Sequence, residues 1–198
     1  MKFSFTLLHG WNGEGELPAA LRGNHLQPHQ LLLLLSDGSL TTHLETLYNS
    51  PLTIEIKESG TTSIDEEDAA FLGVSKGDEA VARGTWLKIE GKKLVYAKTL
   101  LPTDKLESRV VEDVSTSDVP LGRLLARSHP FLRKDRSEMG VVTSPSIAGE
   151  LEMAEDTPLW ARRYLLMAQP EHGGASLRAM VMEIFAPELM GTPPSKVT

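Results

Sequence analysis

Two pairs of alternating segments, each closed by a glycine-containing turn, constrain the fold of this 198-residue chain more than any other feature. Residues 79–90 and 92–101 are predicted to be strands that meet at Glu90-Gly91, a dipeptide suited to a tight turn. Residues 160–168 and 176–186 form a second pair of the same kind. Because short connections join neighbouring strands in opposite directions, the chain is predicted to build an antiparallel sheet.

Helices are predicted between these strands, and one further strand over residues 51–58 precedes the first hairpin. The helical segments are predicted at residues 31–35, from Thr41 or Thr42 onward, at 63–72, from Pro120 onward and at 146–154. This order favours an α+β fold with a single antiparallel sheet and helices packed on one face.

We expect three parts in the chain. Residues 1–25 contain several glycines and are predicted to be an irregular N-terminal segment. Residues 26–190 are predicted to form one domain, and residues 191–198, rich in Pro, Ser and Lys, a flexible tail.

A weak internal repeat connects the two hairpins. Residues 72–83 align without gaps on residues 151–162, and a hairpin follows each segment. The alignment ends on Arg83 and Arg162. Chance explains the low identity as well as duplication does; if the repeat is real, a helix–hairpin unit is used twice.

Composition excludes several classes of protein. Twenty Lys and Arg against 27 Asp and Glu give a net charge of −7, which argues against a nucleic-acid or anionic-membrane surface. The chain has no Cys, so disulfides, thiolate catalysis and Cys-type zinc sites are excluded, and its scattered His residues form no metal-ligand pattern. The longest apolar run, Leu31–Leu35, is too short to span a membrane, and no signal peptide is recognisable, so we expect a cytoplasmic protein.

Arg83 is the strongest candidate for a ligand-binding residue. Alternation places it on one strand face with Val81, Thr85 and Leu87. An arginine in an apolar row needs an anion, because a desolvated charge without a partner costs several kcal/mol. Its forked guanidinium suits a ligand carboxylate. A buried ion pair with a glutamate, or a side chain that reaches water at the strand end, is the structural alternative.

Glu183 and Lys98 are the candidates on the other strands. Glu183 lies in the apolar run 179–186, where desolvation favours a protonated carboxyl that suits a general acid. A structural pair with Arg83 or Arg162 is equally open. Lys98 lies four residues before a proline in the first hairpin, as Glu183 does in the second, and is either a second anion contact or a solvated lysine.

A local basic stretch stands out in this acidic chain. Its members are Arg123, Arg127, Arg133, Lys134 and Arg136. We interpret the stretch as a solvated helix face, with the alternative that it draws a small anionic ligand inward.

Four groups of residues, in order along the chain, resemble the chorismate pyruvate-lyase family. Residues 33–41 are similar to the family's leucine-rich stretch that ends in a Ser-Met-Thr turn, and residues 83–102 to its Arg-x-x-x-Leu…Gly…Ala-x-Arg-Thr-x-x-Pro hairpin. Residues 119–123 resemble its Thr-Pro-Leu-Gly-Arg. Residues 159–163 and 182–187 resemble its Leu-Trp-Gly-Arg-Arg and Thr-Glu-Leu-Phe-Leu-Pro.

The resemblance implies a chorismate lyase-like fold, which also serves as the UTRA-type ligand-sensing domain of transcriptional regulators. It implies cofactor-free conversion of chorismate to 4-hydroxybenzoate and pyruvate in a closed pocket under helical flaps. Arg83 would bind the ring carboxylate, and Glu183 would lie at the opposite end and assist departure of the enolpyruvyl oxygen. Leu40, where the family has Met, and Leu121 would line the pocket.

Chorismate carries a second carboxylate, and the resemblance leaves its partner open. Lys98, which stands where the family often has Arg, is one candidate, and Arg162 or Arg163 is the other. A non-catalytic domain of the same fold that binds a small aromatic acid is the competing function.

Overall fold

The computed structural model describes residues 4–8, 10–13, 26–104, 106, 108–127, 131–169 and 177–193. The predicted turn at residues 173–174 and the tail beyond residue 193 lie outside this part. The elements, in chain order, are β1 (Thr6–Leu7), β2 (Asn12–Gly13), α2 (Pro28–Leu35), α3 (Leu40–Tyr48), β3 (Leu52–Ser63), α4 (Glu66–Leu72), β4 (Glu79–Ile89), β5 (Lys92–Pro102), α5 (Ser108–Thr116), α6 (Leu121–Leu125), β6 (Phe131–Thr143), α7 (Pro145–Glu150), β7 (Leu159–Gln169), β8 (Leu177–Phe185) and α8 (Pro187–Met190).

The strands of the described residues form a single antiparallel sheet. Its order is β1-β6-β7-β8-β5-β4-β3, and β2 also pairs with β6. The two predicted hairpins, β4–β5 and β7–β8, lie side by side at the centre because β5 pairs with β8. The α+β class with one antiparallel sheet is thereby confirmed.

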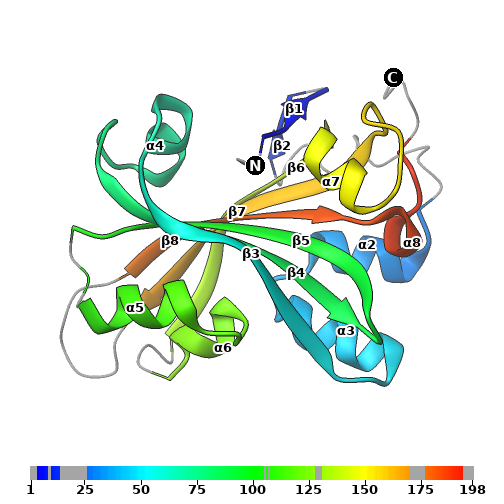
Figure 1. Cartoon of the computed structure of the whole chain (residues 1–198), viewed down its shortest axis with the longest axis horizontal. Helices are drawn as coiled ribbons and strands as arrows, with labels where there is room; N and C mark the ends of the chain where they lie inside the picture. Colours follow the sequence, from blue (N-terminus) through cyan, green and yellow to red (C-terminus); the bar gives the residue numbers. More distant parts are fainter. Residues whose placement is uncertain are drawn as a thin grey trace.

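Helices cover both sides of this sheet, whereas the sequence predicted one helical face. Figure 1 shows α2, α3, α5 and α6 on one side of the sheet, and α4 and α7 on the other. Leu44 of α3 and Val114 of α5 pack on the first side. Phe71 of α4 and Ile147 of α7 pack on the second. Both faces of the central strands are therefore buried.

Strand β6 was not predicted, and the basic stretch is not a helix face. Arg123 lies on α6, whereas Arg133, Lys134 and Arg136 lie on β6. The register of β6 against β7 shifts between Asp135 and Glu138, and Arg136 has a φ of 50°. Charged residues and this bulge interrupt the alternation of apolar and polar residues, so the sequence pattern does not reveal the strand.

Smaller corrections concern helix and strand ends. Ser39, rather than Thr41 or Thr42, caps α3, because its hydroxyl accepts a hydrogen bond from the Thr42 amide. Helix α5 was not predicted. Within the N-terminal segment predicted to be irregular, β1 and β2 pair with β6 and extend the edge of the sheet.

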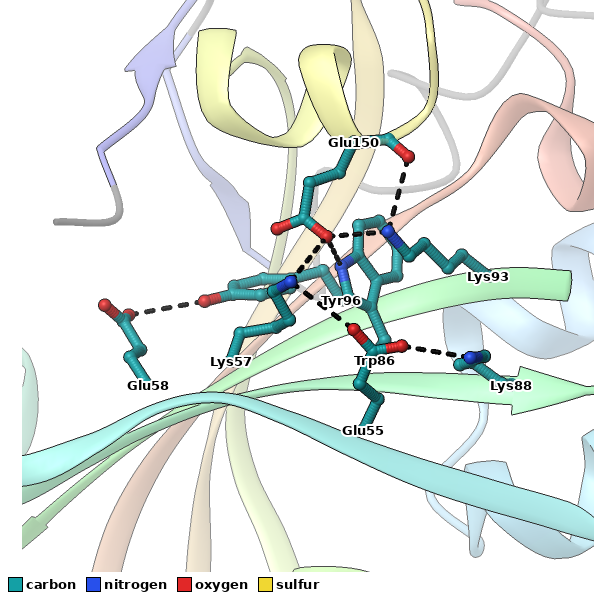
Figure 2. A network of polar contacts seen from close by, with 8 residues as sticks. All are labelled: Glu55, Lys57, Glu58, Trp86, Lys88, Lys93, Tyr96 and Glu150. Atoms are coloured by element: carbon teal, nitrogen blue, oxygen red, sulfur yellow. Dashed lines mark hydrogen bonds and ion pairs between the residues drawn. The ribbon is translucent and has the colours of Figure 1, made fainter. Parts of the chain in front are cut away.

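A polar network joins α7 to the side of the sheet that carries α4 (Figure 2). Glu150 accepts hydrogen bonds from Trp86 Nε1 at 2.9 Å and Lys93 Nζ at 2.7 Å, and it pairs with Lys57 at 3.2 Å. Burial raises the pKa of Glu150, but hydrogen bonds from Lys93, Lys57 and Trp86 lower it more, so the net shift is downward. The network therefore holds an ionised carboxylate over Trp86.

Gly84 permits close contact on the same side of the sheet. A Cβ atom at this position would lie 2.1 Å from the Tyr96 hydroxyl oxygen and 2.8 Å from Glu58 Cγ. The Tyr96 hydroxyl donates a hydrogen bond to Glu58 at 3.3 Å, as Figure 2 shows. Only glycine leaves room for this arrangement.

Candidate ligand-binding site

A cavity of about 480 Å³ lies between the sheet and the elements α3, α6 and the α2–α3 loop. This volume is typical of small-molecule sites. Of the five site residues predicted from the sequence, Arg83, Glu183, Leu40 and Leu121 line the cavity. Lys98 does not.

Arg83 is buried at the cavity wall, with 3% of its surface exposed. Its Nη2 donates to the Ser117 carbonyl at 2.5 Å, and its Nη1 donates to the Val119 carbonyl at 3.3 Å. Within the described part of the chain, its buried Nε has no hydrogen-bond partner and the guanidinium forms no ion pair. Burial lowers the pKa of Arg83, and the charge of Asp118 partly offsets this. The predicted alternative, a buried pair with a glutamate, is not formed here.

Glu183 is held by two donors from the neighbouring strand β7. It accepts hydrogen bonds from Arg162 Nε at 2.5 Å and from the Tyr164 hydroxyl at 3.0 Å. Burial, followed by the charge of Glu183, raises the pKa of Tyr164, so this hydroxyl keeps its proton and donates. Glu183 thus has two polar partners, unlike the apolar surroundings that the sequence suggested. The pair with Arg162, one of the predicted alternatives, is present.

Lys98 lies on the opposite side of the sheet. It lines a second hollow of about 300 Å³, together with Glu58, Asp65 and Asp68. The sequence suggested that Lys98 and Glu183 are equivalent, because each precedes a proline by four residues. The two prolines are not equivalent, however, since Pro102 is the last residue of β5, whereas Pro187 lies beyond β8 and begins α8. A displacement of one residue along a strand moves a side chain to the other face.

Cross-strand register identifies the true equivalent of Glu183. Arg83 pairs with Thr99 in the first hairpin, and Arg162 pairs with Glu183 in the second. Thr99 lines the cavity, as Glu183 does. The residue in the first hairpin that corresponds to Glu183 is therefore Thr99, and not Lys98.

Arg163 also lies away from the cavity. Its Nε donates to Glu138 at 2.7 Å and its Nη1 donates to Glu67 at 2.9 Å. Its guanidinium also stacks on the rings of Trp11 and Phe71. These contacts give it a structural role on the side of the sheet that carries α4.

Lys134 of β6 lines the cavity and was not chosen as a site residue from the sequence. Its Nζ donates to the carbonyls of Ser36 at 3.0 Å and Gly38 at 2.8 Å, in the α2–α3 loop. Burial and the charge of Arg162 lower the pKa of Lys134 to about 8. The basic stretch in the sequence pointed to this residue, because one interpretation of it was the attraction of a small anion. The alternation typical of a strand was not recognised in that stretch.

The site has no feature of a metal centre in the part of the chain that the structure describes. No group of three or more His, Asp or Glu residues is placed there to hold a metal ion. None of the helices described is long and apolar enough to cross a membrane. The fold and the cavity thus define a single-sheet α+β protein with a cavity of the size of a small-molecule site.

The chain belongs to the family of Rv2949c-like chorismate pyruvate-lyases, whose model matches residues 34–192. A probable chorismate pyruvate-lyase of Shewanella loihica is 31% identical over 160 residues, which cover 78% of each chain. Another from Pseudomonas putida is 26% identical over 173 residues, which cover 87% of this chain and 88% of the relative. The resemblance inferred from the sequence is confirmed.

Solved structures with the same fold include an effector domain and a ligand-binding domain. The effector domain of PhnF from Mycobacterium smegmatis matches with a TM-score of 0.59 and 17% identity, over 76% of this chain and 90% of that domain. The chain spans 65% of the longer PhnF structure, with a TM-score of 0.58 and 15% identity. The ligand-binding domain of a putative GntR-family regulator from Bordetella bronchiseptica matches with a TM-score of 0.53 and 18% identity, over 73% and 92%. These similarities confirm the UTRA-type fold.

Proposed function

We propose that this protein is a chorismate lyase that converts chorismate to 4-hydroxybenzoate and pyruvate without a cofactor. Membership of the family supports the reaction. The observation that carries the proposal is Arg83, a buried cation at the cavity wall that has a free Nε–H and no ion pair among the described residues. A ring carboxylate in the cavity would give this buried cation a charged partner.

In this proposal the substrate ring lies across the cavity. Its carboxylate binds Arg83, and the apolar side chains of Leu40 and Leu121 contact the ring. Its other end, which bears the hydroxyl and the enolpyruvyl ether, lies near Glu183. Holding both ends in one orientation supplies much of the rate enhancement, because the reacting groups no longer search for each other.

The chemistry needs one bond broken and one proton moved. The ring carbon–oxygen bond breaks, and its electron pair leaves with the enolpyruvyl oxygen. The neighbouring ring carbon, which bears the hydroxyl, loses a proton, and that electron pair completes the aromatic ring. Glu183, which accepts hydrogen bonds from Arg162 and Tyr164, accepts this proton and returns it to the departing enolpyruvate, which becomes pyruvate. Glu183 thus assists departure by accepting a proton first, rather than by donating one as the sequence suggested.

The test mixes purified protein with chorismate, without metal or cofactor. Pyruvate is followed by a coupled assay, and the aromatic product is identified by chromatography. We expect equal amounts of pyruvate and 4-hydroxybenzoate, and a loss of about 100-fold or more in kcat for Glu183→Gln with KM little changed. The control is Glu188→Gln, at a surface pair with Lys92. Absence of pyruvate contradicts the lyase proposal, whereas normal turnover by Glu183→Gln contradicts only the role of Glu183.

A non-catalytic domain that binds a small aromatic acid is the second candidate. It is favoured by the similarity to effector and ligand-binding domains of regulators. Titration calorimetry separates the two functions. Tight binding of 4-hydroxybenzoate by a protein that leaves chorismate intact would support the binding domain.

A further inference from the structure

We propose that Lys134 binds the second carboxylate of a dicarboxylate ligand, at the opposite end of the cavity from Arg83. The identity of that carboxylate, the one that leaves within pyruvate, rests on the proposed lyase function. The existence of the second anion site rests on the cavity alone.

The cations that the sequence predicted to hold this carboxylate lie outside the cavity or form other contacts. Lys98 lies on the other side of the sheet, and Arg163 pairs there with two glutamates. Arg162 is bound to Glu183 and to the carbonyls of Leu33 and Leu34 at the end of α2. None of the three offers a free charge to the ligand.

Four cationic residues line the cavity, and they differ in their partners. Arg123 pairs with Glu45, and Arg133, whose side chain is 69% exposed, pairs with Asp135. Arg83 and Lys134, by contrast, donate only to backbone carbonyls among the residues that the structure describes. A backbone carbonyl carries only a partial charge, so both cations keep a capacity for an anion.

A row of paired residues begins at Arg83 and crosses the sheet toward Lys134, which pairs with Leu166 on β7. Arg83 on β4 pairs with Thr99 on β5, Thr99 pairs with Val181 on β8, and Val181 pairs with Tyr164 on β7. Lys134 Nζ lies 4.6 Å from the centre of the Tyr164 ring. Three strand spacings, roughly 14 Å along the sheet, separate the backbones of Arg83 and Tyr164. Both side chains line the same cavity, so this separation leaves room for a ligand between them.

Glu183 lies between the two ends, beside the same tyrosine. The Tyr164 hydroxyl bonds Glu183 while the Tyr164 ring contacts Lys134. A chorismate whose ring carboxylate binds Arg83 would place its ether oxygen near Glu183. The side-chain carboxylate beyond that oxygen would then meet Lys134.

The charges that face Lys134 predict how binding depends on pH. Asp37 in the α2–α3 loop and Glu183 on β8 favour its charged form, whereas burial and Arg162 disfavour it, and its pKa is lowered to about 8. The Tyr164 hydroxyl stays neutral in this range, since its pKa is raised. A carboxylate binds only the charged lysine well, so affinity for a dicarboxylate should fall as the pH rises above about 8.

Calorimetry with two probes tests the inference without turnover. The probes are 3-(carboxymethoxy)benzoate, which has a ring carboxylate and an ether-linked second carboxylate, and 4-hydroxybenzoate, which has one carboxylate. We expect Lys134→Met to weaken binding of the diacid roughly 10- to 100-fold and to change binding of the monoacid less than about 3-fold. Lys134→Arg should restore most of the diacid affinity. Lys76→Met, which removes an exposed lysine on the far side of α4, is the matched control.

The outcomes separate this inference from a structural role and from the proposed reaction. Equal losses for both probes would show that Lys134 only holds the α2–α3 loop, and no loss would show that it is not a ligand contact; either result overturns the inference. Wild-type protein gives an independent check, because diacid binding that does not weaken above about pH 8 also contradicts it. A protein that binds the diacid through Lys134 and yet releases no pyruvate from chorismate would refute the lyase function alone.

Discussion

In the β4–β5 hairpin Arg83 lies directly across from Thr99, whereas in the β7–β8 hairpin Arg162 lies directly across from Glu183. Both arginines are buried to the same extent, with 3% of their surface exposed. Arg162 has a carboxylate partner inside the protein, and Arg83 has none in the described part of the chain. One cross-strand neighbour therefore decides whether a buried arginine becomes part of the structure or remains available to a ligand.

The largest effect is expected when the internal pair is broken. Arg162→Met leaves Glu183 buried without its cation, so the free energy of unfolding should fall by about 3–5 kcal/mol. Urea denaturation followed by circular dichroism measures this change. Arg123→Met removes a partly exposed pair with Glu45 and should cost at most about 1 kcal/mol. Equal losses of unfolding free energy in the two variants would show that the buried pair stabilises the fold no more than the exposed pair does.

The next effect concerns the arginine that lacks a partner. Arg83→Met should raise KM for chorismate roughly 100-fold, because it removes a charge-assisted contact to the ring carboxylate, while stability changes less than in Arg162→Met. Steady-state kinetics and denaturation on the same preparations provide both numbers. Lys98→Met removes a cation from the other side of the sheet and should leave KM within about 2-fold. An unchanged KM in Arg83→Met would remove the anion site from the proposal.

The third change converts one arrangement into the other. Thr99→Glu would give Arg83 the cross-strand carboxylate that Arg162 already has. We expect the new pair to compete with the ligand and to weaken binding of 4-hydroxybenzoate by about 10-fold or more, with Thr99→Gln as the uncharged control of the same size. Calorimetry measures both. If the two variants bind 4-hydroxybenzoate equally, the absence of a charge at position 99 is not what keeps Arg83 available to the ligand.

Local sequence patterns predict the two hairpins well, because alternation and a glycine turn are sufficient to define a hairpin. They also place Arg83 on the face that lines the cavity and single out Glu183, and the family resemblance adds Leu40 and Leu121. The partner of Glu183 depends on which residue of β7 lies opposite it. That register is a long-range property, so the sequence left several pairs open.

The failures have the same physical origin. Lys98 was assigned to the cavity by its distance from a proline. The side of the sheet on which a side chain lies depends instead on the register with which its strand pairs. Strand β6 was missed because the charged Lys134 stands on the face that lines the cavity, so the strand lacks the apolar alternation by which strands are recognised.

Gly84 follows Arg83 in β4, and the space beside it belongs to Tyr96 and Glu58 on the far side of the sheet. A larger residue at position 84 would have to displace the tyrosine, and with it the strand that presents Arg83. In an alignment of functional relatives, position 84 should therefore vary only together with position 96. Pairwise covariation between these two positions would then reveal a constraint on the cavity that comes from the opposite side of the sheet.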